Sequence, residues 1–561
     1  MMKNEFVYNV REITNIRELL EGSFEANPDN IAFLARTADN GVSQILYHTL
    51  MEDVKGFATF LNAQGLEGKK VAVVGKNCYE WALTYLAVCA GTGVIVPLDK
   101  ELRADEIETL LLDAEASAVV YSDSVSEKIA TCHLDGCLKL NMNDMADYVA
   151  EGLRLIEEGD TSYANHKIDP FGLGVLLYTS GTTGVSKGVM LSQYNICSDI
   201  MHVVRRLKVD PTDRVLSVLP LHHTYECMAG FLTVIYIGGS IAYNESLRKL
   251  MSDLALFQPT VLVVVPLFLE TFQKNIVRKY SKVKGGRALL SAQSALAIGN
   301  EAWRRTMFKS VHQAFGGRLR MFLCGAAAVK PDTFRFFEKM GIAVRIGYGL
   351  TETAPVCLMH NDFYHSPDDI GYPLVGVQAK LFDINEDGVG ELAVKGPNVM
   401  LGYYKNPAET EKVFCDGWFL TGDLARIKPN GAYQITGRKK SMIVAYNGKK
   451  IFPEELEYYL EESPLVSECF VYPTGEQDNP IVTAAVYPCE EEVKLALEKR
   501  GLAVDDESLK ALLMDLVHEV NAKFPNYKHI QKLIIRKTEF VKTTTRKIKR
   551  NDEENRQEDE A

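Results

Sequence analysis

The residues from Tyr178 to Gly188 read YTSGTTGVSKG, and they combine the features of a phosphate-binding loop. Small residues let backbone N–H groups approach an anion, hydroxyl groups donate further hydrogen bonds, and Lys187 supplies positive charge. The spacing is not that of a Walker loop, which after Gly181 would require glycine at position 186, where serine stands. On composition alone, a phosphate cradle and an ordinary Ser/Thr/Gly turn explain this stretch equally well.

Five later stretches also carry residue types that could do chemistry: LPLHHTYE (219–226), YGLTET (348–353), WFLTGD (418–423), ITGRKKSMIVAYNGKK (435–450) and KTTTRKIKR (542–550). Each has an ordinary interpretation when taken singly. Glu352 could be a helix N-terminal charge, and Asp423 after a glycine is typical of a turn. The last stretch could be a solvated basic segment.

The elements that must position these stretches alternate between short apolar runs and helical patterns. VAVVG and VIVPLD read as buried strands, and YEWALTYLAVCAG between them reads as a helix. Alternation of this kind favours an α/β fold with largely parallel, buried strands. The same logic places YTSGTTGVSKG between a strand ending near Leu177 and a helix formed by VMLSQYNICSDI.

The pattern changes twice along the chain, and the changes predict its domains. FDINEDGVGELAVKG has short strands and glycine-bearing turns, which indicates a β-rich subdomain. A compact α+β unit begins beyond Arg438. We therefore expect a large N-terminal domain over residues 1–439, built of α/β subdomains plus the β-rich one, and a small C-terminal domain over 440–550. The acidic residues 551–561 lack an apolar anchor and are expected to be disordered.

Composition limits the classes of function. A chain of 561 residues with 47% hydrophobic and 24% charged residues is an ordinary globular protein of more than one domain. The formal net charge of −12 argues against a general nucleic-acid binder. The N-terminus has no signal-peptide pattern, and cysteines in apolar stretches suit reduced thiols, so a cytoplasmic location is expected. Peripheral contact with the inner face of a membrane and homodimerisation stay open.

Together, in order and spacing, the six stretches resemble the motifs of the acyl-adenylate-forming (AMP-binding) superfamily, which includes acyl-CoA synthetases, peptide-synthetase adenylation domains and firefly luciferase. The resemblance covers residues from about 30 to 550. The LPLxHxxE form of the histidine motif is most similar to that of long-chain fatty acid CoA ligases. The stretch from His222 to Tyr225 contains no aspartate of the kind that holds an amino-acid substrate in peptide synthetases.

The resemblance implies an ATP site, a magnesium ion and a role for most of the motif residues. Glu352 would bind Mg²⁺, Thr351 would hydrogen-bond the α-phosphate and Tyr348 would lie against adenine. Asp423 would accept hydrogen bonds from the ribose with Arg438 assisting. His223 would line the carboxylate pocket, although His222 competes for this role. The loop residues implied to hold the β- and γ-phosphates are Thr179, Ser180, Gly181, Thr182, Thr183, Gly184 and Lys187.

The C-terminal motif departs from the family pattern PKTxxGKIxR, because Val541 replaces the proline and Arg546 the glycine. Lys547 keeps its spacing and would contact the carboxylate and α-phosphate. The resemblance also implies a hinge at Lys440, about which the small domain would rotate between two half-reactions. After rotation, the loop around Gly448 would admit the pantetheine arm of CoA.

The expected activity is AMP-forming activation of a medium- to long-chain fatty acid, followed by transfer to CoA. An acyl carrier protein could replace CoA as the acceptor, since both end in a phosphopantetheine thiol. Lys449, Lys450 and Arg536 could serve either acceptor. A catalytically silent nucleotide-binding protein is a second alternative, which predicts loss of Lys187, Glu352 or Lys547, and all three are present. A plain ATPase or kinase lacks its motif set here.

Overall fold

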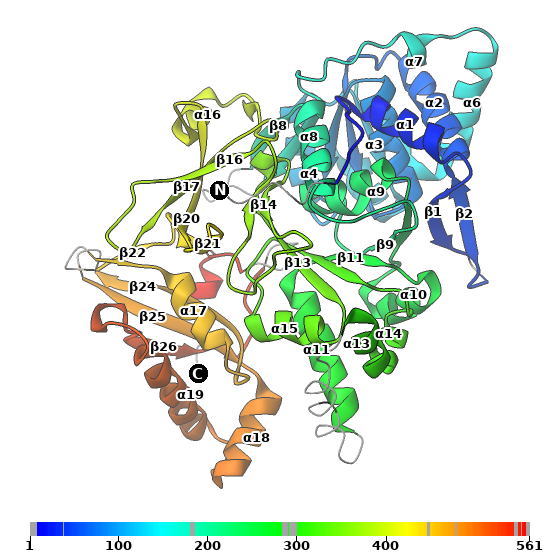
Figure 1. Ribbon diagram of the computed structural model, residues 1–561. Coiled ribbons are helices and arrows are strands. Elements are labelled where there is room, and N and C mark those ends of the chain that lie inside the picture. The colour runs from blue at the N-terminus through cyan, green and yellow to red at the C-terminus, as the bar shows by residue number, and fades with distance from the viewer. Residues whose placement is uncertain are drawn as a thin grey trace. The chain divides into compact units, whose positions relative to one another are not determined.

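The computed structural model describes residues 8–37, 39–179, 186–282, 290, 300–445, 449–476, 479–542, 548–550 and 552–556 (Figure 1). The chain divides into two compact units. Unit 1 comprises Met1–Ala379 and Val394–Phe419, and unit 2 comprises Lys380–Ala393 and Leu420–Ala561. No helix within the described ranges is long and apolar enough to cross a membrane.

The first sheet of unit 1 has seven strands in the order β18-β8-β7-β4-β3-β5-β6. Neighbouring strands from β7 to β6 are parallel, whereas β8 runs antiparallel to β7 and β18 antiparallel to β8. The strands are β3 (Lys70–Val74), β4 (Val94–Leu98), β5 (Ala118–Tyr121), β6 (Leu138–Asn141), β7 (Val175–Thr179), β8 (Lys187–Leu191) and β18 (Gly402–Tyr403). The central parallel strands β3, β4 and β5 are apolar runs buried on both faces, as parallel strands under helices must be.

One element near the opening motif differs from the expectation. The motif connects two strands, β7 and β8, and not a strand and a helix. KGVML pairs along its length with β7, with Tyr178 opposite Gly188, so it is a strand. The helix α8 (Gln193–Val204) begins only after Ser192, whose hydroxyl caps it by accepting from the Asn195 N–H.

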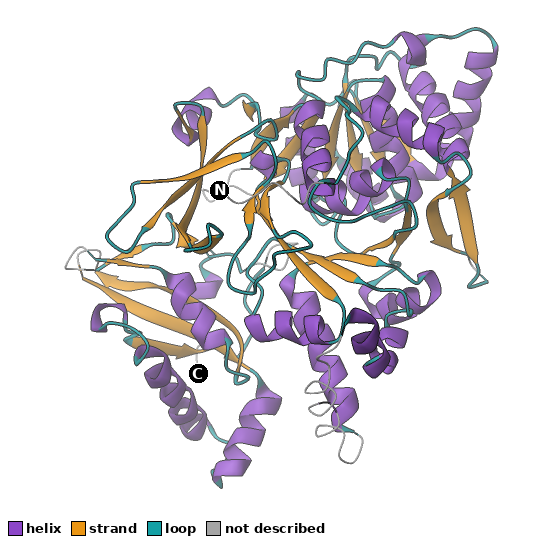
Figure 2. Cartoon of the chain, in the orientation of Figure 1, coloured by secondary structure: helices purple, strands orange, loops and turns teal. Residues whose placement is uncertain are grey.

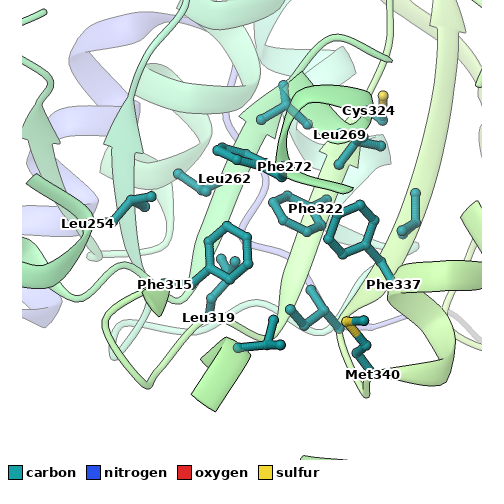
Figure 3. Packing of buried hydrophobic residues seen from close by; sticks show 14 of the residues in the cluster. Leu254, Leu262, Leu269, Phe272, Phe315, Leu319, Phe322, Cys324, Phe337 and Met340 are labelled. Atoms are coloured by element: carbon teal, nitrogen blue, oxygen red, sulfur yellow. The ribbon is translucent and has the colours of Figure 1, made fainter. Parts of the chain in front are cut away.

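The second sheet of unit 1 has nine strands in the order β15-β14-β13-β12-β11-β9-β10-β1-β2. They are β1 (Ile31–Arg36), β2 (Val42–Leu46), β9 (Arg214–Ser217), β10 (Ser240–Tyr243), β11 (Val261–Val264), β12 (Met321–Cys324), β13 (Ala343–Gly349), β14 (Val356–Met359) and β15 (Tyr372–Pro373). Its core is rich in phenylalanine: the ring of Phe322 packs edge to face against Phe315 and Phe337, and Phe272 stacks on it (Figure 3). This packing fixes β12 and β13, from which YGLTET extends.

Helices flank the strands of both sheets in unit 1 (Figure 2). They are α1 (Ile16–Ala26), α2 (Tyr47–Ala63), α3 (Tyr79–Gly91), α4 (Ala104–Ala114), α5 (Ser126–Thr131), α6 (Met145–Glu157), α7 (Ser162–Asn165), α8, α9 (Thr233–Tyr236), α10 (Leu250–Phe257), α11 (Pro266–Ser281), α13 (Glu301–Met307), α14 (Lys309–Ala314), α15 (Pro331–Lys339) and α16 (Pro407–Val413). A π-helix, η3 (Glu226–Leu232), precedes α9, and a 3-10 turn, η5 (Thr351–Thr353), follows β13.

A smaller sheet has the order β16-β17-β20-β19, with β21 beside β20. Its strands are β16 (Gln378–Phe382), β17 (Val389–Lys395), β19 (Phe414–Cys415), β20 (Trp418–Ile427) and β21 (Tyr433–Arg438). Unit 2 contains the hairpin of β22 (Ile443–Val444) and β23 (Lys450–Ile451), the sheet of β24 (Val466–Glu476), β25 (Asn479–Pro488) and β26 (Lys532–Ile535), and the helices α17 (Pro453–Glu461), α18 (Glu490–Arg500) and α19 (Asp506–Asn521). The expected α/β class, with a larger and a smaller part, is confirmed.

The acidic tail departs from the expected disorder over residues 552–556. Asn555 is fully buried, and its side-chain amide donates to the carbonyls of Val541 and Lys549, both at 2.9 Å. Arg536 is only 2% exposed, and its guanidinium donates to the carbonyl of Glu554 at 2.8 Å. Arg536, one of three basic residues that could serve either acceptor, therefore helps to hold the tail in place. Residues 557–561 lie outside the described ranges.

Candidate functional site

The β7–β8 hairpin positions both described ends of the opening motif. Thr179, the last residue of β7, pairs with Lys187, the first of β8, and its hydroxyl lies 3.5 Å from the Lys187 carbonyl oxygen. Ser180, Gly181, Thr182, Thr183 and Gly184 lie outside the described residues. The antiparallel pairing fixes where the loop begins and ends, which is what a backbone cradle for an anion requires.

The ammonium group of Lys187 is paired with a carboxylate. Its Nζ lies 2.6 Å from Oε2 of Glu409 in α16, and both side chains are largely buried, at 17% and 30% exposed. The hydrogen bond from Lys187, together with one from Lys412, lowers the pKa of Glu409 to about 2. Glu409 is therefore an anion at any physiological pH. It forms an ion pair with Lys187, the residue that the sequence predicts to bind phosphate.

YGLTET turns sharply at the end of β13. The Thr353 hydroxyl accepts from the Leu350 N–H at 2.9 Å and donates to the Pro355 carbonyl at 2.6 Å. A Cβ at Gly349 would lie 1.7 Å from that same carbonyl oxygen, so only glycine fits. This turn places Thr351 and Glu352 in η5, just after the end of β13, the strand that carries Tyr348.

A buried amide fixes the η5 turn from the other side. Asn398 is fully buried, and its Nδ2 donates to the carbonyls of Thr353 at 3.0 Å and Val356 at 2.7 Å. The Met400 N–H donates to the Glu352 carbonyl at 2.8 Å. The backbone that carries Glu352 is thus held by the segment leading into β18.

Lys187 and Glu352, which are far apart in the sequence, meet around one side chain. The hydroxyl of Tyr403 in β18 donates to Oε1 of Glu352 at 2.8 Å, and the Lys187 ammonium lies 5.1 Å from the centre of the Tyr403 ring. The structure therefore brings Lys187 and Glu352 to one side chain, with Thr179 opposite Lys187 on β7. Tyr403 was not among the predicted residues.

The histidine motif follows β9 and leads into η3. His222 lies 3.5 Å from Asp99 through its Nε2, and burial, reinforced by the nearby charge of Lys100, lowers the pKa of His222 to about 3. His222 is therefore neutral at physiological pH. The ring of His223 lies 4.2 Å from that of His222 between centroids.

The residue that holds this motif was not among the predicted site residues either. The side-chain amide of Asn77, just before α3, donates to the Leu219 carbonyl at 2.7 Å and to the Ser217 hydroxyl at 3.0 Å. Its oxygen accepts from the Leu221 N–H at 3.1 Å. A lone asparagine between a strand and a helix is typical of a turn, so its contact with a segment far along the chain gave no local signal.

A small apolar cavity lies beside the motif. It is lined by Tyr85, Val175, Leu177, Ile196, Thr224, Cys227, Met228 and Leu232. Cys227, the second residue of η3, lines this cavity. The ring of Tyr225 packs on Gly325, where an added Cβ would come within 3.0 Å of it.

Asp423 and Arg438 form an ion pair in unit 2. They are opposite each other on β20 and β21, with Arg438 Nε 2.9 Å from Asp423 Oδ1. The Asp423 side chain is 5% exposed and that of Arg438 is 52% exposed. Lys440 follows in an exposed turn. Gly448 and Lys547 lie outside the described residues.

Comparison with known proteins agrees with this geometry. The AMP-binding enzyme family matches residues 20–404, and the AMP-binding enzyme C-terminal domain matches residues 440–560. This chain belongs to the AMP-binding enzyme family. The matched ranges contain every motif residue singled out above except Asp423 and Arg438, which lie between them.

Relatives of this AMP-binding enzyme include human long-chain-fatty-acid–CoA ligase 1, which is 29% identical over 91% of this chain and 80% of its own length. A chloroplastic long-chain-fatty-acid–[acyl-carrier-protein] ligase of Arabidopsis thaliana is 26% identical over 90% of this chain and 79% of its own. The crystal structure of ATP-bound MatB from Rhodopseudomonas palustris matches with a TM-score of 0.75 and 27% identity, over 96% of this chain and 98% of that one.

The donor set of this AMP-binding enzyme fits a magnesium ion that comes with its nucleotide. Among the residues the structure describes, no group of three or more His, Cys, Asp or Glu side chains could hold a metal ion. Glu352 offers one carboxylate, of which Tyr403 engages Oε1. Mg²⁺ is commonly held by one or two carboxylates plus substrate phosphates, so Glu352 suits this role.

Proposed function

We propose that this AMP-binding enzyme activates a fatty acid of medium to long chain with ATP and transfers the acyl group to CoA. The observation that carries the proposal is the joint position of Lys187 and Glu352 around Tyr403, in a chain that aligns over nine-tenths of its length with a long-chain-fatty-acid–CoA ligase. A cation and a carboxylate so placed suit a magnesium–triphosphate substrate.

In the first half-reaction, the fatty acid carboxylate attacks the α-phosphorus of ATP, and pyrophosphate leaves with the electron pair of the broken P–O bond. Two anions must approach each other, so positive charge and N–H donors are needed around them. Bound Mg²⁺ supplies charge neutralisation at the phosphate oxygens. Lys187 binds the β- and γ-phosphates with residues 179–184, and Thr351 hydrogen-bonds the α-phosphate.

The remaining residues orient the substrates. Tyr348 lies against adenine, Asp423 and Arg438 hold the ribose, and His223 lines the carboxylate pocket next to His222, whose ring is neutral. Lys547 contacts the carboxylate and α-phosphate. We place the acyl chain beside the histidine motif, where each buried methylene would add about 0.8 kcal/mol.

In the second half-reaction, the CoA thiolate attacks the acyl carbonyl and AMP leaves. Rotation of residues 440–550 about Lys440 exchanges Lys547 for the loop around Gly448. CoA is favoured over a carrier protein as acceptor by the human relative, and the Arabidopsis relative supports the carrier protein as the alternative. We also propose that the enzyme acts in the cytoplasm. Contact with a membrane surface and a homodimeric state are the other parts of the proposal.

Fatty-acid-dependent exchange of radiolabelled pyrophosphate into ATP tests the first half-reaction alone. The wild type should exchange label only when fatty acid is present. Lys440→Pro should leave one half-reaction near the wild-type rate and impair the other, because proline fixes φ at the proposed hinge. Equal loss of exchange and of thioester formation in folded Lys440→Pro would rule out the rotation.

A further inference from the structure

Tyr403 is fixed more firmly than its two-residue strand would suggest. It pairs with Val189 of β8, the strand that begins at Lys187, and its N–H donates to the Thr410 hydroxyl at 2.9 Å. Gly402 beside it has φ 140°, and a Cβ there would come within 2.9 Å of Thr410. The side chain of Tyr403 is therefore placed by three segments and is only 7% exposed.

The phenol makes two different contacts with groups of opposite charge. Its hydroxyl donates to Glu352 Oε1 at 2.8 Å, and its ring meets the Lys187 ammonium at 5.1 Å from the centroid. The phenol therefore contacts the carboxylate and the ammonium group at once.

Charge would otherwise favour a different pairing. An ammonium and a carboxylate that share one half-buried site attract each other strongly, and a direct Lys187–Glu352 pair would neutralise both groups. Within the described part of the chain, the ion-pair partner of Lys187 is Glu409 at 2.6 Å, and Glu352 has no ion-pair partner. Each of the two charged groups instead contacts a different part of Tyr403, Glu352 the hydroxyl and Lys187 the ring.

We propose that Tyr403 is a positioning residue that keeps Lys187 and Glu352 from pairing and aims the Glu352 carboxylate at magnesium. This inference rests on the proposed function, in which Lys187 binds phosphate and Glu352 binds Mg²⁺. The hydroxyl fixes Oε1 and leaves Oε2 for the ion, as the outer hydrogen-bond partners of metal-binding carboxylates commonly do. The ring contacts the ammonium by a cation–π interaction, beside the ion pair that Lys187 makes with Glu409.

Two substitutions separate the two contacts. Tyr403→Phe removes the hydroxyl and keeps the ring, whereas Tyr403→Leu removes both. Tyr404→Phe is a matched control, because the neighbouring hydroxyl contacts Lys70 at 2.8 Å and Glu115 at 3.0 Å instead of the site. Each purified variant is first compared with the wild type by thermal unfolding.

The test measures binding of a fluorescent methylanthraniloyl-ATP, with and without Mg²⁺ and without fatty acid, so that no turnover is needed. In the wild type, Mg²⁺ should tighten binding. In Tyr403→Phe the tightening by Mg²⁺ should fall roughly 10- to 100-fold, the usual effect of losing an outer partner of a metal ligand. Binding without Mg²⁺ should stay within about twofold of the wild type, because the cation–π contact remains. Tyr404→Phe should match the wild type in both conditions.

Tyr403→Leu should also weaken binding without Mg²⁺, since Lys187 can then pair with Glu352, and adding Glu352→Gln should restore it. Wild-type behaviour of Tyr403→Phe, or equal effects in Tyr403→Phe and Tyr404→Phe, would overturn the inference while leaving the proposed function in place. Absence of ATP binding by the wild type would instead overturn both. If Tyr403→Leu does not fold, the contrast between the two phenylalanine variants decides alone.

Discussion

The free energy of unfolding of unit 1 should fall as the pH rises because of Glu226, and replacing Glu226 with glutamine should remove this pH dependence. Glu226 is the first residue of η3 and is fully buried. The carboxyl group has room there because residue 230 is glycine, where an added Cβ would lie 2.6 Å from Oε1. Burial raises the pKa of Glu226 to about 8, with the Ser217 hydroxyl opposing the shift. The side chain is thus largely protonated in the folded protein at neutral pH.

The sign and size of the effect follow from the two pKa values. The ordinary pKa of 4.5 applies in the unfolded chain, so between 4.5 and about 8 the folded protein binds more protons and its stability falls as the pH rises. Between about pH 5 and about pH 8 this amounts to roughly 3 kcal/mol. Glutamine has nearly the same shape and no charge, so the variant should lack this pH-dependent loss of stability.

The assay is thermal unfolding of the wild type and Glu226→Gln across that pH range, followed by fluorescence. The melting temperature of the variant should exceed that of the wild type by an amount that grows with pH. Glu127→Gln, at an exposed position of α5, should show no such growing difference. Parallel pH profiles for the wild type and Glu226→Gln would refute a protonated Glu226. Infrared detection of a buried protonated carboxyl group in the wild type, absent in the variant, gives a second check.

Two further outcomes follow from the site. Glu409→Gln should tighten binding of ATP, because Lys187 would no longer have to break an ion pair of 2.6 Å before it binds phosphate. Unchanged or weaker binding in a titration would show that Glu409 instead orients Lys187. Gly349→Ala should lower the free energy of unfolding by more than about 3 kcal/mol or prevent folding, because its Cβ would lie 1.7 Å from a backbone carbonyl oxygen. Gly347→Ala, in the same strand, is the control: its Cβ would have its nearest neighbour at 3.7 Å, so it should melt like the wild type.

The elements of unit 1 were predictable wherever a buried strand or helix carried its own pattern. VAVVG, VIVPLD and YEWALTYLAVCAG became β3, β4 and α3, because apolar runs bounded by polar residues specify their own burial. The exception was β8, where KGVML is too short to distinguish a strand from the first turn of a helix. Its pairing with β7 decided the matter, and that pairing is tertiary.

Residues that act through distant contacts were beyond sequence reasoning. Tyr403 lies in a two-residue strand with no periodicity of its own, and its importance appears only when β18 pairs with β8. Asn77 and Glu409 likewise act on motifs far along the chain. Asn555 shows the reverse error, since an acidic, polar segment seemed unable to pack and yet one asparagine anchors it through three hydrogen bonds.

The most direct test of the proposed activity is to identify the products formed from ATP, Mg²⁺, CoA and a series of acids from acetate to oleate, using mass spectrometry. The account predicts acyl-CoA, AMP and pyrophosphate in equal amounts, with the largest yield from the longer chains, and loss of all three in Glu352→Gln. Formation of ADP and phosphate, or no AMP with any acid, would contradict it.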